Sequence, residues 1–300
     1  MTSPGIRRAV TAYRPTEWDR LLLRHSTPGQ ARFFLETRNR TVDEVLEHHH
    51  LQTEAIKQVE NAVPATWRRS RVDRSDFPSF LFEPDDVVIA VGQDGLVPNL
   101  AKYLKGQVVI GVNPDPGQYE GTLVRCSTSA VADLIADIDS VRARIESRTM
   151  VEARLDDGQS LVALNEIYVG HRTHQSSRYV LHDDDRQERQ SSSGLIVATG
   201  TGASGWARSI ATERASEVAL PLPEERRLVF FVREAWPSIA SGTTVVEGSI
   251  AEPSRLRLIS EIDEGGVLFG DGIESDHLDI AWGQEVSVGV ADRDLRLVTP

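Results

Sequence analysis

Two patterns of apolar and polar positions follow one another along the chain. From Ala9 to Ser147, short apolar runs alternate with segments in which apolar residues recur every three or four positions, which predicts alternating strands and helices. This alternation is typical of a parallel sheet with helices on both faces. After about Met150 the apolar runs follow one another with turn residues between them, which predicts a mostly antiparallel β-sandwich.

The two patterns predict two domains, a Rossmann-like α/β domain over residues 1–148 and an all-β, sandwich-like domain over residues 149–300. The strands predicted in the first domain are Ala9–Tyr13, Trp67–Val72, Val87–Val91 and Gln107–Val112; its helices are Trp18–Arg24, Thr41 to Pro64, Leu96–Leu104 and a helix from Ser127 or Ser129 to Ile145. The second domain has one predicted helix, Ala203–Thr212, and strands at Val151–Leu155, Leu161–Tyr168, Arg178–Leu181, Gly194–Ala198, Leu228–Val232, Thr243–Ile250, Arg255–Ile262, Val267–Phe269, His277–Ile280, Glu285–Val290 and Leu295–Val298.

Composition narrows the class of protein. The chain has 300 residues, 40% of them apolar and 26% charged, as expected of a soluble globular protein. A net charge of −12 argues against nucleic acid or an anionic membrane as partner, because both favour clustered Lys and Arg. Cys126 is the only cysteine, which indicates a reducing compartment such as the cytoplasm. No apolar run approaches the roughly 20 residues that span a bilayer, and the N-terminus lacks the apolar core of a secretory signal.

The most informative stretch of the first domain is the buried strand Val87–Val91 with the turn Gly92-Gln93-Asp94-Gly95 after it. A strand, a glycine turn and a helix together place backbone N–H groups and a helix N-terminus beside a phosphate. An exposed carboxylate in this turn can accept a proton from a hydroxyl group. The alternative is an ordinary turn with a solvated Asp94, since short glycine motifs often match by chance.

The second domain has two polar segments of the same kind. Asn165 and Glu166 lie side by side in a strand pattern, so one of them can face a cleft while the other supports it. The segment from Thr199 to Trp206 follows a buried strand and combines glycines, hydroxyls and an indole on which a purine can stack. A turn with Trp206 in the core is the alternative.

In their order and spacing, these segments resemble the NAD kinase family, which shares its fold with diacylglycerol and sphingosine kinases. The resemblance covers nearly the whole chain and is closest to the mitochondrial type. The further matching features are Gly111-Val-Asn113 with Asp115-Pro116, Glu120-Gly121, Ser192-Ser193-Gly194, Thr199-Gly200-Thr201-Gly202, Val232-Arg233-Glu234, Gly270-Asp271-Gly272 and Glu47-His48-His49.

The resemblance implies a role for each matching residue. It makes Asp94 the base toward the 2′-hydroxyl of the adenosine ribose of NAD, with Gly92 and Gly95 beside the phosphates. The residues implied in nucleotide binding are Asn113, Asn165 and Glu166, the last two on ribose hydroxyls, and Thr199, Thr201, Gly202, Ser204, Gly205, Trp206 and Ser209 around the adenine. It also implies ATP or another phosphoryl donor, magnesium carried with ATP, and a homo-oligomer; no residue is assigned as a metal ligand.

Two departures from the family turn leave alternatives open. Gln93 replaces a glycine and Leu96 replaces a threonine, so the phosphate-binding backbone and one hydroxyl donor are altered. We expect Leu96 to pack inward with Leu100 and Leu104, which lie at helical spacing from it. The alternatives to an NAD kinase are a non-catalytic nucleotide-binding protein of the same fold and a kinase of another hydroxylated acceptor, such as a sugar, nucleoside or lipid.

Overall fold

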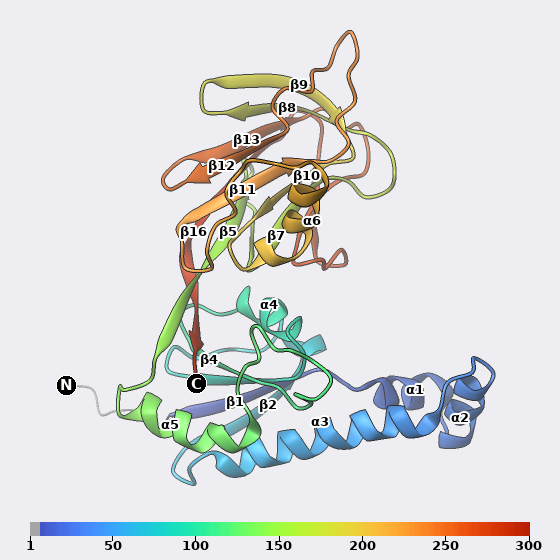
Figure 1. The fold of residues 1–300 in the computed structure, drawn as a ribbon, viewed down its shortest axis with the longest axis vertical. Coiled ribbons are helices and arrows are strands. Elements are labelled where there is room, and N and C mark those ends of the chain that lie inside the picture. Colours follow the sequence, from blue (N-terminus) through green and yellow to red (C-terminus); the bar gives the residue numbers. More distant parts are fainter. Residues whose placement is uncertain (1–6) are drawn as a thin grey trace. The chain divides into compact units, whose positions relative to one another are not determined.

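The computed structural model describes residues 7–300 and divides the chain into two compact units. Unit 1 consists of Met1–Glu146 together with Arg296–Pro300, and unit 2 of Ser147–Leu295 (Figure 1). The last residues of the chain therefore belong to unit 1 and not to the second domain, where the sequence pattern placed them. The reason is strand pairing, because Arg296 and Leu297 pair in parallel with Val108 and Val109.

Unit 1 alternates strands and helices. Its elements are β1 (Arg8–Tyr13), α1 (Glu17–His25), α2 (Pro28–Glu36), α3 (Val42–Ala62), β2 (Arg68–Asp73), the 3-10 turn η1 (Arg74–Asp76), β3 (Val87–Val91), α4 (Leu96–Ala101), β4 (Val108–Val112), the 3-10 turn η2 (Thr128–Ala130) and α5 (Val131–Asp139), with the start of β5 (Ile145–Leu155) and the end of β16 (Glu285–Val298).

The strands of unit 1 form a parallel sheet in the order β2-β1-β3-β4, with the end of β16 beside β4. Helices α3 and α5 pack on one face, where their apolar side chains share a core with Val87, Ile89 and Val91. Successive strand residues point to opposite faces, and α4 lies on the other side of the sheet (Figure 1). The expected parallel sheet with helices on both faces is confirmed.

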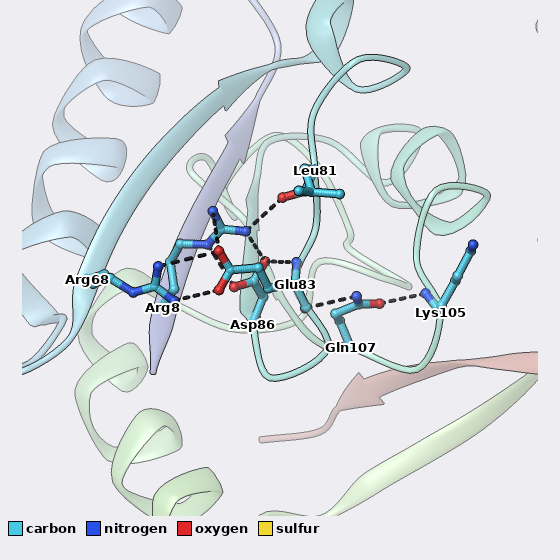
Figure 2. Close-up of polar contacts among 7 residues, drawn as sticks. All are labelled: Arg8, Arg68, Leu81, Glu83, Asp86, Lys105 and Gln107. Atoms are coloured by element: carbon cyan, nitrogen blue, oxygen red, sulfur yellow. Dashed lines mark hydrogen bonds and ion pairs between the residues drawn. The ribbon is translucent and has the colours of Figure 1, made fainter. Parts of the chain in front are cut away.

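Polar groups hold the amino ends of these strands together (Figure 2). Arg8 donates to both oxygens of the buried Asp86 carboxylate, at 2.8 and 2.6 Å, and the backbone N–H of Glu83 donates to the same carboxylate at 2.7 Å. The buried Gln107 amide donates to the Glu83 carbonyl at 3.0 Å and accepts from the backbone N–H of Lys105 at 2.6 Å. These bonds fix the starts of β1, β3 and β4 relative to one another.

Two parts of unit 1 differ from the sequence-based prediction. Helix α2 was not predicted, because it is short and buries only Ala31 and Leu35, in a small core shared with α1 and α3. Helix α5 ends at Asp139 and does not reach Ile145, because Val141 adopts a left-handed backbone with φ of 57° and Ile145 opens β5.

Unit 2 is a β-sandwich, as expected. Its elements are β5, β6 (Ser160–Ala163), β7 (Glu166–His171), β8 (Ser177–Asp183), β9 (Arg186–Ser192), β10 (Leu195–Ala198), the 3-10 turn η3 (Gly202–Ser204), α6 (Trp206–Glu213), β11 (Arg227–Val232), β12 (Glu247–Ala251), β13 (Arg255–Ser260), β14 (Gly266–Gly270), β15 (His277–Ile280) and most of β16. One antiparallel sheet has the order β12-β11-β10-β7-β14-β15, and the other contains β16-β13-β8-β9 with β5 beside β16 and β6 beside β5. Apolar side chains of both sheets form one core, among them Leu195 and Phe230 from the first sheet and Tyr179 and Leu256 from the second.

Unit 2 also differs from the prediction at particular strands. The strand predicted over Leu161–Tyr168 is interrupted at Leu164 and Asn165, which separate β6 from β7. Strand β9 was not predicted, because its sequence is almost wholly polar and buries only Gln190 and Ser192. The two last predicted strands form one strand, β16.

Candidate functional site

The turn Gly92–Gly95 connects β3 to α4 in unit 1. Every residue of β3 is buried, and the N–H of Gly92 donates to the carbonyl of Val112, which holds the turn beside the end of β4. Gln93 is exposed, and its φ lies outside the left-handed region, so this position accommodates a side chain without strain. Leu96 is buried together with Leu100 and Leu104, as expected.

The carboxylate of Asp94 is bound by the backbone of a neighbouring loop. The N–H of Thr122 donates to Oδ2 at 2.8 Å, and those of Leu123 and Val124 donate to Oδ1 at 2.8 and 3.0 Å. A carboxylate has about four lone-pair sites, so one site on Oδ2 stays available. Asp94 therefore anchors this loop, a contact that the sequence did not predict.

The end of β4 continues into a loop that Asn113 shapes. Its side-chain amide donates to the carbonyl of Tyr119 at 2.7 Å, and its side-chain oxygen accepts from the N–H of Asp115 at 2.9 Å. Asn113 is buried, and both ends of its side chain are used within the loop. The structure thus gives Asn113 a loop-forming role beside the Gly92–Gly95 turn.

Helix α3 contributes side chains to this edge of the unit 1 sheet. Gln52 donates from Nε2 to the carbonyl of Val91 at 2.8 Å, directly before Gly92. His48 Nδ1 lies 3.3 Å from Oδ2 of Asp115. Sequence analysis did not single out Gln52, because a glutamine in a polar helix gives no signal of the strand that it contacts.

In unit 2, three separate segments meet around Asn165 and Glu166. The carboxylate of Asp271 accepts the N–H groups of Leu164 and Asn165 at 3.1 and 2.6 Å. The hydroxyl of Thr199 donates to the carbonyl of Leu164 at 2.6 Å, and the N–H of Thr199 donates to the carbonyl of Asn165 at 2.9 Å. These bonds hold the bend between β6 and β7 in one conformation.

The glycine turn after β10 packs directly against this bend. A Cβ on Gly202 would lie 2.2 Å from the carbonyl oxygen of Asn165, so only glycine permits the approach. The hydroxyl of Thr199 accepts the N–H groups of Thr201 and Gly202 at 3.1 and 3.2 Å and so shapes the turn. Ser204 closes it by donating to the carbonyl of Thr201 at 3.1 Å. The structure therefore brings the Asn-Glu segment and the Thr-Gly turn together.

Glu166 has an unusual environment for a carboxyl group. Burial raises its pKa to about 7, and the nearby charge of Asp271 contributes to the same shift. Within residues 7–300, no hydrogen bond or ion pair involves the Glu166 carboxyl group or the Asn165 amide group. Both side chains are half-buried, so they are available to hydroxyl groups of a ligand.

Trp206 begins α6 and is half-buried. Its ring stacks on Tyr168 with centroids 6.2 Å apart and 13° between the planes, and the guanidinium of Arg233 lies 4.9 Å from the ring centroid. Trp206 also packs against the apolar cluster of α6 and β10. These contacts fit the alternative in which the indole is part of a core, and its contact with adenine stays a prediction.

The remaining predicted residues and one further residue surround the turn. Gly205 and Ser209 are exposed at the start of α6. Arg148, which the sequence did not single out, is buried with Nη1 3.4 Å from the hydroxyl of Thr201. Across residues 7–300 there is no group of three or more His, Cys, Asp or Glu side chains placed to hold a metal ion, and none of the helices in this range is long and apolar enough to cross a membrane.

The chain combines a parallel α/β unit that carries a Gly-x-Asp-Gly turn with a β-sandwich in which an Asn-Glu and a Thr-Gly segment adjoin, and this fold is similar to that of a solved NAD kinase. The crystal structure of an NAD kinase from Archaeoglobus fulgidus in complex with ATP superposes with a TM-score of 0.59 at 17% identity, covering 97% of this chain and 93% of that one. The fold expected from the sequence is thereby confirmed.

Sequence comparison gives relatives with the same family name. NAD kinase 2, mitochondrial, is 25% identical in Rattus norvegicus and 26% identical in Homo sapiens, over 55% and 62% of this chain. The NAD kinase of Chlorobaculum tepidum is 27% identical over 41% of the chain. The chain spans about half the length of these curated relatives, 50%, 55% and 44% respectively. No family model matches. The resemblance to the NAD kinase family, including its mitochondrial type, is confirmed.

Proposed function

We propose that the protein is an NAD kinase-like phosphotransferase that transfers a phosphoryl group from ATP or another donor to the 2′-hydroxyl of the adenosine ribose of NAD, giving NADP. The observation that carries the proposal is the contact in unit 2 between the Asn165–Glu166 segment and the glycine turn after β10. There Asp271 and Thr199 hold Asn165 and Glu166 against the glycine turn at Gly202. An amide and a carboxyl group with no other partner in the described chain suit the paired hydroxyls of a ribose. The similarity to NAD kinases supports the same acceptor.

The chemistry of transfer follows from the groups present. The 2′-hydroxyl oxygen attacks the terminal phosphorus, the bond from that phosphorus to the bridging oxygen breaks, and ADP leaves when ATP is the donor. The hydroxyl proton passes to the remaining lone pair on Oδ2 of Asp94. Backbone N–H groups of residues 93–95 in this turn hold the phosphates, and placement supplies most of the acceleration. Magnesium enters as part of the ATP substrate, coordinated by phosphate oxygens and water.

A second candidate is a nucleotide-binding protein of the same fold without catalysis. The observation in its favour is that the Asp94 carboxylate accepts hydrogen bonds from three backbone N–H groups. The proposed base thus has a structural role in the neighbouring loop. The side chains at Gln93 and Leu96 also alter the family turn. On this hypothesis the unit 2 segment binds NAD and no phosphate is transferred.

The deciding experiment is formation of NADP from NAD, ATP and magnesium, followed by an NADP-specific dehydrogenase. Steady NADP formation that requires the donor supports the kinase. NAD binding by calorimetry without any NADP, from ATP or inorganic polyphosphate, supports the second candidate. If NAD does not bind while a sugar, nucleoside or lipid consumes ATP, the protein is a kinase of another acceptor.

We also propose a homo-oligomer in the cytoplasm. The family resemblance supports the oligomer, and a single buried cysteine, Cys126, suits a reducing compartment. Sedimentation of the purified protein tests the first point. Localisation of a tagged chain tests the second.

A further inference from the structure

Three adjacent strands of unit 1 end at the same level of the sheet. Tyr13, the last residue of β1, pairs with Asp73 at the end of β2 and with Val91 at the end of β3. The next residues are Arg14, Arg74 and the glycine that opens the Gly92–Gly95 turn. In parallel α/β sheets, ligands bind beyond the carboxyl ends of the strands. Arg14 and Arg74 therefore lie at the edge of the sheet that carries the proposed phosphate-binding turn.

These arginines are close to one another and to a third. Partial burial lowers the pKa of Arg14, and repulsion by the guanidinium groups of Arg20 and Arg74 lowers it further. Within residues 7–300, neither Arg14 nor Arg74 forms an ion pair or a side-chain hydrogen bond. Arg20 donates only to the carbonyl of Pro15, at 3.1 Å. None of these three guanidinium groups forms an ion pair within residues 7–300, in a chain whose net charge is −12. Arg20 is close enough to Glu17 to contribute, after Arg40, to the lowered pKa of that carboxyl group.

The hydrogen bonds and ion pairs of the neighbouring acids involve groups other than Arg14 and Arg74. Asp19 accepts the N–H and hydroxyl of Thr16 at 2.8 and 2.7 Å, and Asp73 accepts the N–H and hydroxyl of Ser75, both at 2.8 Å. Glu17 forms an ion pair with Arg40. Asp94 accepts backbone N–H groups, as described above. Clustered guanidinium groups that form no ion pair favour an anion with several oxygens, and phosphate matches their planar donors.

We propose that Arg14 and Arg74, with Arg20 beside them, form a binding site for a phosphate chain at the carboxyl edge of the unit 1 sheet. The chain belongs to ATP or to inorganic polyphosphate, which present the same oxygens to these side chains. That this anion is the phosphoryl donor rests on the proposed function. The binding itself does not, so it is measured in the absence of NAD.

The test is calorimetric titration with ATP and with tripolyphosphate, using wild type, Arg14→Gln, Arg74→Gln and the double variant. A lost hydrogen bond to a charged group predicts that each single change weakens both ligands by about tenfold or more, with adenosine unaffected. Arg14→Lys keeps the charge and restores part of the affinity. Arg32→Gln is the matched control, because Arg32 is exposed on α2 and makes no polar contact in the described chain. Thermal unfolding confirms that each variant is folded.

Unchanged tripolyphosphate affinity in the folded double variant would overturn the proposal, as would an equal loss in Arg32→Gln. If ATP and tripolyphosphate displace each other, they share the site. The donor that then yields NADP identifies which of the two supplies the chain. A protein that binds tripolyphosphate through these arginines but forms no NADP retains this inference and loses the proposed function.

Discussion

The carboxylate of Asp271 accepts the backbone N–H of Asn165 at 2.6 Å, although the two residues are 106 positions apart in the sequence. The backbone of Asp271 closes the link, because its own N–H donates to the carbonyl of Glu166 at 3.0 Å. Asp271 has a left-handed φ of 54°, a conformation that Asp and Asn tolerate better than most residues. Asp271 is therefore a positioning residue for the Asn165–Glu166 pair.

Replacing Asp271 with Asn tests this role without disturbing the backbone. The amide keeps one acceptor oxygen but places its NH₂ group against one of the two N–H donors, so we expect a loss of about 1–3 kcal/mol in the free energy of unfolding. We also expect weaker NAD binding, measured by calorimetry on the folded variant. Asp263→Asn, at an exposed loop position, is the control. Equal NAD affinity in both variants would remove Asp271 from the site.

The raised pKa of Glu166 predicts that the free energy of unfolding depends on pH. Its folded-state pKa of about 7 lies above the ordinary 4.5, so the folded protein keeps a proton that the unfolded chain releases within this window. The contribution of Glu166 to stability therefore falls as pH rises from 4.5 to 7, by at most about 3 kcal/mol. We expect Glu166→Gln to gain stability relative to wild type between pH 5 and pH 8 in urea unfolding. A constant difference between the two proteins would contradict the prediction, and Glu264→Gln is an exposed control.

Asp94→Asn separates a catalytic from a structural effect. As a lost general base, we expect turnover to fall by about 10²–10⁴ with NAD affinity little changed. As a lost anchor, we expect faster amide hydrogen exchange at residues 122–124, because an amide group offers a single acceptor oxygen to their three N–H groups. Asp133→Asn, exposed on α5, should change neither quantity. Turnover within tenfold of wild type would exclude Asp94 as the base.

Restoring the family turn should have unequal effects at its two altered positions. Leu96 is 4% exposed, so Leu96→Thr removes buried methyl groups and buries a hydroxyl, and we expect a loss of about 2–5 kcal/mol in unfolding free energy. Gln93 is exposed with an ordinary φ, so Gln93→Gly should cost about 1 kcal/mol or less. Denaturant unfolding of the two single variants measures both effects. Similar losses would show that position 93 carries an unrecognised contact.

The sequence predicted the elements whose apolar pattern is strong and missed those that bury few side chains. Val87–Val91 and Leu228–Val232 bury every position or nearly so, and hydrophobic runs of this kind were located within a residue. Strand β9 and helix α2 bury two side chains each, too few for a pattern that stands out in the sequence. Apolar periodicity in a sequence reflects which side chains an element buries. It therefore gives little signal for β9 and α2, which are held mainly by the elements beside them.

For the candidate site, the sequence indicated residue types but not their partners. The Asp of Gly270-Asp271-Gly272 was noted as a family feature, yet its bond to Asn165 arises only from the pairing of β14 with β7. In the same way, nothing local reveals that Asp94 binds residues 122–124 or that Gln52 binds Val91. These contacts join segments far apart in the chain, and only the fold determines them.

The return of the chain to unit 1 through Arg296 and Leu297 has a consequence for biosynthesis. Unit 2 is one continuous stretch, Ser147–Leu295, whereas unit 1 needs residues that the ribosome makes after all of unit 2. The edge of β4 that pairs with Arg296 stays open until those residues leave the exit tunnel. Domains of a nascent chain generally fold in the order of their synthesis. Here unit 2 can complete its sheets before unit 1 does. Until then unit 1 has an unpaired strand edge on β4, and such an edge favours aggregation and binding by chaperones.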